Sequence, residues 1–198
     1  MKKAILLGVA ALCMASCGSS SKEDAIQRLP SDQISVFTSS DKQLENAYNW
    51  AKKMALSYAH DNSDPVGYWY EAALPQREAF CMRDVSHQSV GAQILGLARH
   101  NKNMFTRFVE NISEEKDWCT YWEINRYNKP APADYTNDKE FWYNLNANFD
   151  VMQACLKMYQ WTGDAGYLTD PLFTNFYEKS VNEYVHRWAL EPEKIMDR

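Results

Sequence analysis

Apolar residues recur at intervals of three and four along most of the chain, which is the spacing of one face of an α-helix. The alternation of apolar and polar residues that is typical of a strand occurs only weakly, at residues 34–38. The pattern therefore predicts an all-α chain. Helices are expected at residues 41–60, 84–99, 102–113, 146–161 and 170–188.

Two of these helices have clear start signals. Asp41 can cap the first helix, and Asp170 can cap the last one, with Pro171 at its first position. The large apolar residues at helical spacing are expected to face the core. They are Leu44, Ala47, Tyr48, Ala51, Ala55 and Tyr58; Val90, Ile94, Leu97 and Ala98; Phe105, Phe108, Val109 and Ile112; Phe149, Met152, Leu156 and Tyr159; and Phe173, Phe176, Tyr177, Val181, Tyr184, Val185 and Trp188.

The connections between the expected helices alternate between long and short. Residues 61–83 and 114–145 form long connections, whereas tight turns are expected at His100-Asn101 and at residues 162–164. Antiparallel helices joined by short turns form hairpins, so both long connections should emerge at the same end of the array. Connections of this length are usually functional. We therefore expect one rim of the molecule to hold the functional residues.

The first residues have the anatomy of an export signal. A positive start at Lys2 and Lys3 precedes an apolar stretch over residues 4–12, which is too short to span a bilayer. The run Met14-Ala15-Ser16-Cys17 resembles a bacterial lipobox, which implies a signal at residues 1–17 and lipidation of Cys17. Residues 18–39 would be a tether and lead-in. An ordinary secretory signal cleaved nearby is the alternative.

This leader predicts an exported bacterial lipoprotein at the outer membrane, facing the cell surface or the periplasm, with membrane contact only through its lipid anchor. The net charge is −5 and no basic block is present, so a nucleic-acid partner is not expected. Cys81, Cys119 and Cys155 have neither disulfide-framework nor zinc spacing, and we expect buried free thiols. No cofactor motif is present, so no metal or cofactor is expected.

Both long connections mix aromatic residues with carboxylates, arginine and asparagine. Aromatic rings cover the apolar face of a sugar, and charged or amide side chains bind its hydroxyls. This composition therefore indicates a carbohydrate ligand, although the aromatics could instead form small cores within the loops. The candidate contacts are Trp69, Tyr70, Trp122, Asn125 and Trp142.

Residues 79–88, Ala-Phe-Cys-Met-Arg-Asp-Val-Ser-His-Gln, resemble an element at a helix start of six-hairpin glycosidases. These are (α/α)6-toroid glycoside hydrolases, which include glucoamylase-like enzymes, exo-acting α-mannosidases and Bacteroidetes lipoproteins. Residues 141–150 and 161–164 also resemble the fourth helix of such proteins, so the resemblance covers residues 40–190. It implies that Arg83 and Asp84 bind sugar hydroxyls and that His87 and Gln88 line the pocket. Cys81 stands where an aromatic residue is common, and Asp84 could simply cap its helix.

Glycoside hydrolysis needs two carboxyl groups that flank the scissile bond. The candidates are Glu123, Glu71 and Asp84, with Asp150 as a further carboxylate on the rim. Glu123 lies in the sequence among Tyr121, Trp122 and Asn125, an environment that could raise its pKa toward that of a general acid. An exposed loop carboxylate is the alternative for Glu123.

The resemblance also implies that this chain is incomplete, because five expected helices are fewer than the twelve of a six-hairpin toroid. We expect residues 40–198 to be the N-terminal part of such a toroid, with exposed apolar helix faces, weak stability and no activity in isolation. The expected function of the full-length form is glycoside hydrolysis of oligo- or polysaccharides. The alternatives are a non-catalytic exported glycan-binding lipoprotein and a structural helical module.

Overall fold

The computed structural model describes residues 35–73 and 77–190. The expected signal, Cys17 and most of the lead-in therefore lie outside the described residues. The helices are α2 (Lys42–Leu56), α3 (Met82–Ile94), α4 (Ala98–Val109), α5 (Ala147–Thr162), α6 (Gly166–Thr169), α7 (Pro171–Lys179) and α8 (Val185–Arg187), with a 3-10 turn η1 (Glu114–Lys116) and a π-helical turn η2 (Ser180–Tyr184).

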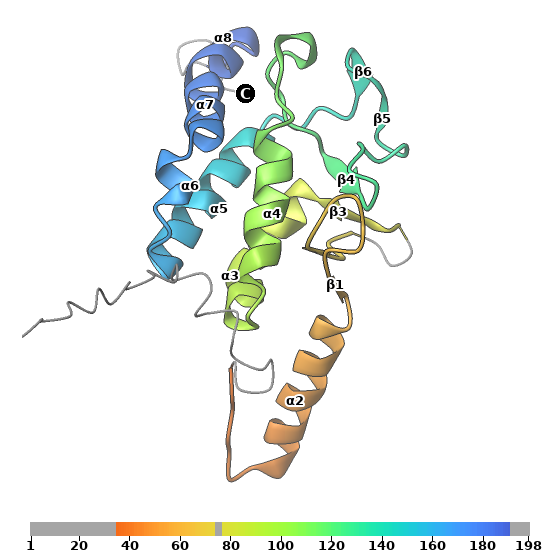
Figure 1. Ribbon diagram of the computed structural model, residues 1–198, viewed down its shortest axis with the longest axis vertical. Helices are drawn as coiled ribbons and strands as arrows, with labels where there is room; N and C mark the ends of the chain where they lie inside the picture. The colour runs from red at the N-terminus through yellow and green to blue at the C-terminus, as the bar shows by residue number, and fades with distance from the viewer. Residues whose placement is uncertain (1–34, 74–76, 191–198) are drawn as a thin grey trace, which may run out of the picture.

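Short strands occupy the long connections, so the chain is helix-rich but the expectation of an all-α chain was only roughly right. Three antiparallel pairs form, β1 with β2, β3 with β4, and β5 with β6. Figure 1 shows these pairs on one side of the molecule and helices α5 to α8 on the other. The strands are β1 (Ala59–His60), β2 (Trp69–Tyr70), β3 (Ala79–Cys81), β4 (Glu123–Asn125), β5 (Tyr135–Asn137) and β6 (Glu140–Phe141).

The strand expected at residues 34–38 is wrong for its described part, since residues 35–38 belong to no strand. Ser35 has a φ of 61°, which is left-handed and incompatible with extended backbone. Its carbonyl accepts from the Tyr48 hydroxyl at 3.0 Å and from Lys52 Nζ at 3.1 Å. These side-chain bonds take the place of a hydrogen bond from a neighbouring strand. The lead-in is therefore tied to α2 by side chains.

The core lies where α3 packs on α4 and α5, and where α4 packs on α5 and α7. Phe105, Phe108 and Phe173 are almost completely buried there, as their helical spacing predicted. The expected turn at His100-Asn101 is wrong, because α3 ends at Ile94 and α4 begins at Ala98. Gly96, at a φ of 84°, supplies the left-handed residue that this turn requires.

The expected inward faces of α3 and α5 are partly wrong. Ile94, Phe149 and Leu156 are exposed, and so is Val181 in η2. Small residues face the helix contact instead, because they let two backbones approach closely. The buried small residues are Ser86, Ser89 and Ala92 in α3 and Ala147, Ala154 and Cys155 in α5.

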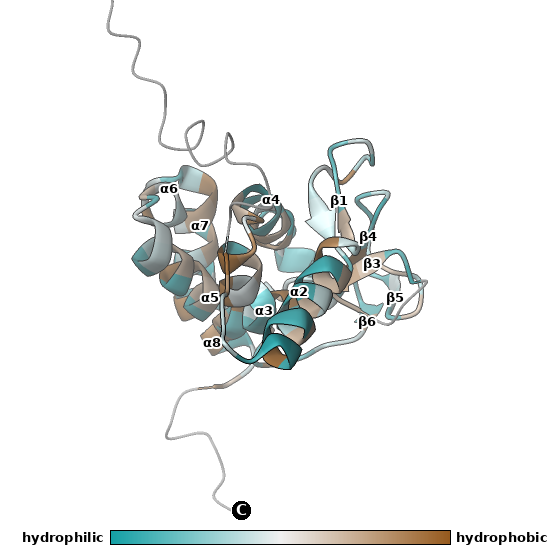
Figure 2. Ribbon diagram, turned by 90° about the horizontal axis from the view of Figure 1, so that it is seen from below, coloured by the Kyte–Doolittle hydropathy of each residue, from teal (hydrophilic) through white to brown (hydrophobic). Residues whose placement is uncertain are grey.

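Helix α2 stands apart from the other helices at one end of the molecule (Figure 1). Asp41 caps it as expected, accepting from the backbone N–H of Gln43 and Leu44. However, none of its residues is buried, and Leu44 and Trp50 are exposed. The expected inward face of this helix is therefore mostly exposed, although Tyr48 is half-buried against the lead-in. Figure 2, in which α2 lies nearest the viewer, shows its mixed hydropathy.

Three further expectations concern the last helix, the thiols and the membrane. Asp170 caps α7 with Pro171 in the first turn, and the helix continues through η2 into α8, as predicted. Cys81, Cys119 and Cys155 are buried and free, which confirms the expectation for the thiols. Among the described residues, no helix has the length and hydrophobicity needed to cross a membrane.

Asn148, at the start of α5, is completely buried and joins three segments. Its Oδ1 accepts from the backbone N–H of Thr120 at 3.0 Å, and its Nδ2 donates to the Trp118 carbonyl and to Ser180 Oγ, both at 2.9 Å. One amide thus satisfies polar groups of the second long connection and of η2.

We predict that Asn148→Ala lowers the free energy of unfolding by about 2–3 kcal/mol, because it leaves buried partners without hydrogen bonds. Urea denaturation followed by circular dichroism measures this change. The exposed Gln153→Ala in the same helix is the control and should change stability by less than about 0.5 kcal/mol. Equal losses in the two variants would contradict this role of Asn148.

Candidate functional site

The two long connections meet through the pairing of β3 with β4. Cys81 lies opposite Glu123, Phe80 opposite Ile124, and Ala79 opposite Asn125. The backbone N–H of Met82, the first residue of α3, donates to the Trp122 carbonyl at 2.8 Å. This pairing places the start of α3, with Arg83 and Asp84, beside Trp122 and Glu123.

Arg83 is the centre of a polar cluster at the starts of α3 and α5. Its guanidinium lies 5.3 Å from the centroid of the Trp122 ring, and its Nη2 donates to Asn146 Oδ1 at 3.0 Å. Asp150 completes the cluster, since its Oδ2 lies 3.9 Å from Arg83 Nε and accepts from Asn146 Nδ2 at 2.6 Å. The structure therefore brings the candidates Arg83, Trp122 and Asp150 together, and it adds Asn146, whose only signal in the sequence is its place at a helix start. We call these four residues the Arg83 cluster.

Glu123 lies in a second cluster directly behind the strand pairing. Its side chain is 1% exposed, and its Oε2 accepts from Arg77 Nη2 at 2.5 Å. The same Arg77 Nη2 lies 3.0 Å from Asp134 Oδ2, so one guanidinium binds two carboxyl groups. We call Arg77, Glu123 and Asp134 the carboxyl triad.

The environment of Glu123 disfavours its ionised form. Burial, and then a hydrogen bond with Asp134, raise the pKa of Glu123 to about 8, with Arg77 opposing the shift and Asp84 adding to it. This agrees in direction with the sequence prediction, although burial is the main cause. Sequence reasoning missed Arg77 and Asp134, because both lie in irregular backbone, which carries no periodic signal.

Four further candidates are accessible. Asp84, His87 and Gln88 are exposed on α3, and Trp142 is 60% exposed. Asp84 is close enough to Glu123 to contribute to its raised pKa. The backbone N–H of Trp142 donates to the Asp134 carbonyl at 2.8 Å, which ties the backbone of Trp142 to that of Asp134.

The structure corrects three of the predicted sugar contacts, because their side chains stabilise the fold and are not free to bind a ligand. Trp69 is completely buried, stacks on His60 with ring centroids 4.1 Å apart, and donates through Nε1 to Asp64. Tyr70 is also buried, with its hydroxyl donating to Asn101 Oδ1. The side-chain oxygen of Asn125 accepts from the backbone of the turn that follows β4. Buried rings have no free face for a ligand, and the Asn125 oxygen is already satisfied.

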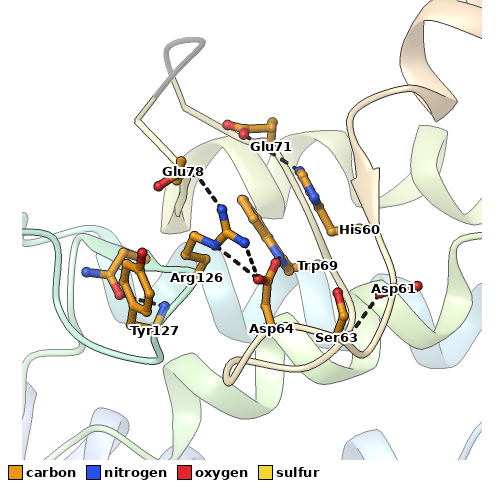
Figure 3. Close-up of polar contacts among 10 residues, drawn as sticks. His60, Asp61, Ser63, Asp64, Trp69, Glu71, Glu78, Arg126 and Tyr127 are labelled. Carbon is orange, nitrogen blue, oxygen red and sulfur yellow. Dashed lines mark hydrogen bonds and ion pairs between the residues drawn. The ribbon is translucent and has the colours of Figure 1, made fainter.

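Glu71 belongs to a separate network that extends along the first connection, which Figure 3 shows. Its Oε1 lies 3.7 Å from His60 Nε2, and its buried Oε2 has no hydrogen-bond partner among the described residues. Burial raises the pKa of Glu71, against the opposing effect of His60. The structure does not bring Glu71 into the carboxyl triad.

The centre of that network is the ion pair of Asp64 with Arg126 (Figure 3). Asp64 Oδ1 accepts from Arg126 Nε at 3.0 Å and Nη2 at 2.6 Å, and Arg126 Nη1 donates to Glu78 at 2.6 Å. Burial opposes ionisation most strongly, but the hydrogen bonds from Trp69 and Arg126 leave the pKa of Asp64 below its ordinary value. The pair joins the first connection to the second.

A shallow depression lies beside the strand pairs of the second connection. Two aromatic rings, two prolines and one lysine line it, and the two rings meet edge to face with centroids 5.4 Å apart. The lining residues are Tyr121, Lys129, Pro130, Pro132 and Tyr135.

The described residues contain no group of three histidine, cysteine or acidic side chains that could hold a metal ion. No family model, curated protein or solved structure matches this chain. The resemblance to six-hairpin glycosidases therefore stays a prediction.

We predict that Asp64→Ala lowers the free energy of unfolding by about 3 kcal/mol, because it leaves the buried Trp69 N–H without an acceptor and Arg126 without its main partner. Urea denaturation measures the loss. Glu78→Gln, which alters only the exposed end of the same network, is the control and should cost less than about 1 kcal/mol. A loss for Asp64→Ala no larger than for Glu78→Gln would refute this prediction.

A second prediction concerns pH. The folded protein holds a proton on Glu123 up to a pKa of about 8, whereas the unfolded chain releases it near the ordinary glutamate value. The protonated Glu123 therefore stabilises the folded state fully at a pH below its pKa in the unfolded chain. This stabilisation is lost as the pH rises through its pKa in the folded protein. Between pH 5 and pH 8.5, stability should fall more in the wild type than in Glu123→Gln. Glu140→Gln, at an exposed position, should behave as the wild type, and identical slopes in all three proteins would count against a protonated Glu123.

Proposed function

We propose that this chain carries part of the active site of a glycoside hydrolase that acts on oligo- or polysaccharides. The observation that carries the proposal is the approach of the Arg83 cluster to the carboxyl triad across the start of α3. The Arg83 cluster provides groups that suit sugar hydroxyls, and the carboxyl triad provides Glu123, a carboxyl group biased toward its protonated form.

The binding half of the proposal rests on Arg83, Asn146 and Asp150, which present donors and acceptors at the surface beside the Trp122 ring. Sugars have paired hydroxyls, which these polar groups can bind, and an apolar face, which the Trp122 ring can cover. Trp142 adds a second accessible ring. His87 and Gln88 remain candidate contacts on the exposed face of α3.

The catalytic half of the proposal needs two carboxyl groups far enough apart to flank a glycosidic bond, about 5 Å or more. Glu123 and Asp134 bind the same guanidinium nitrogen, so they form one unit that acts on one side of the bond. We propose the exposed Asp84 as the carboxylate on the other side. Glu71 is the weaker candidate because it lies in the His60 network.

The fold of the whole domain and the export of the protein are also proposals. Residues 40–198 would form the opening hairpins of an (α/α)6 toroid. Exposed apolar side chains such as Leu44 and Trp50 in α2 and Leu156 in α5 would contact the further helices of that toroid. Export and lipidation at Cys17 remain proposals from the leader sequence.

A second function, glycan binding without catalysis, is favoured by one observation. The Glu123 side chain is almost completely buried and is held by Arg77, so it does not face solvent in this structure. A protein that only binds glycans would need the Arg83 cluster and Trp122 but no reachable acid.

The test compares variants of the longest natural form that contains this chain on aryl glycosides and on plant or host glycans. In the enzyme proposal, Asp84→Asn should reduce hydrolysis by about 100-fold or more while sugar affinity changes only a few-fold. Trp122→Ala should weaken affinity by about tenfold. Trp161→Ala, an exposed ring at the far end of α5, is the control and should change neither. Glycan affinity with no hydrolysis of any substrate would favour the binding function.

A further inference from the structure

Two carboxyl groups and one guanidinium meet in the carboxyl triad. If both Glu123 and Asp134 were ionised, the triad would have a net charge of −1 in a place where Glu123 is removed from water. One added proton makes the triad neutral. Glu123 Oε1 is buried and has no partner among the described residues, so an ionised Glu123 would leave this oxygen without a compensating hydrogen bond.

The two carboxyl groups differ in their access to solvent. The Asp134 side chain is 20% exposed and Arg77 is 33% exposed, whereas Glu123 is 1% exposed. Asp134 also lies in the chain between Pro132 and Tyr135, which line the depression. Asp134 does not itself line the depression, but it is the more exposed of the two carboxyl groups, so a ligand that approaches from solvent would meet Asp134 before Glu123.

We propose that Asp134 is the ligand-facing carboxylate of this rim, and that Glu123 behind it is a positioning residue that shares one proton with it. This inference rests on the proposed function and changes the residue that would meet the substrate. The ligand would be a neutral, hydroxyl-rich molecule, since an ionised carboxylate accepts hydrogen bonds and the rings of Tyr121 and Tyr135 suit an apolar sugar face.

The sharing of the proton balances as a simple transfer. An O–H bond breaks on Glu123 and one forms on Asp134, so the pair keeps one proton and one negative charge, which Arg77 neutralises. The charged groups that act on Glu123 are Arg77, Asp134 and Asp84. Burial keeps this proton mainly on Glu123, so Asp134 keeps the negative charge and can accept hydrogen bonds from a ligand hydroxyl.

The shared proton can be measured without any sugar. Carbon-13 NMR of the side-chain carboxyl carbons follows the titration of Glu123 in the 198-residue chain, with Glu123→Gln used to assign its signal. We expect Asp134→Asn to lower the midpoint of Glu123 by at least about one pH unit, because a negative neighbour is removed and Arg77 remains. Asp138→Asn is the control on the same connection and should leave the midpoint within about 0.3 units. An unchanged midpoint in Asp134→Asn would overturn the shared proton.

Ligand contact is tested in the natural form with the glycosides and glycans that it binds or cleaves. Glu123→Gln keeps a neutral side chain of the same shape and should retain affinity within about threefold, whereas Asp134→Asn should lose at least about tenfold. The reverse order would show that Glu123 is the ligand-facing group and would overturn the assignment. If no sugar binds to any form, the proposed function fails, while the NMR titration still decides whether the proton is shared.

Discussion

The antiparallel pairing of β3 with β4 is the constraint on which the site depends. It joins strands from two different connections and sets Glu123 opposite Cys81, one residue before α3 begins. Because side chains alternate across a strand, a slip of one residue would turn Glu123 to the opposite face and move Trp122 away from Arg83. Only three residue pairs fix this register, so the ion pair of Asp64 with Arg126 and the contacts of Arg77 provide the additional restraint between the connections.

Electrostatics divides the rim into two kinds of site. In the Asp64 network, the hydrogen bonds from Trp69 and Arg126 outweigh the effect of burial, so the Asp64 carboxylate stays ionised and holds the two connections together. In the carboxyl triad, one guanidinium serves two acids and burial prevails, so a proton is retained. The Asp64 network therefore suits a structural role and the carboxyl triad suits proton transfer, although both contain the same residue types.

The sequence predicted the helices and caps well, because helical spacing and the signals at Asp41 and Asp170 are local. It could not predict the strands, since pairs of two or three residues are too short to show alternation and are decided by contacts across the chain. The inward faces of α3 and α5 were misjudged because large apolar residues were favoured over the small ones that permit close packing. In the site, Glu123 was identified from its aromatic neighbours, but Arg77 and Asp134 are distant in sequence and were missed. Trp69 and Tyr70 were misassigned because a core aromatic and a ligand-binding one look alike in a sequence.

The chain between the two paired strands is itself the hairpin of α3 and α4, closed by the short turn around Gly96. Local helical contacts form quickly, whereas strands that are far apart in sequence pair only after the entropy of a long loop has been overcome. Folding of the hairpin shortens that loop, so the helices should form before the strands can meet. The rim is then the last part to assemble, and a partly folded chain could keep its helical signal while lacking any organised site.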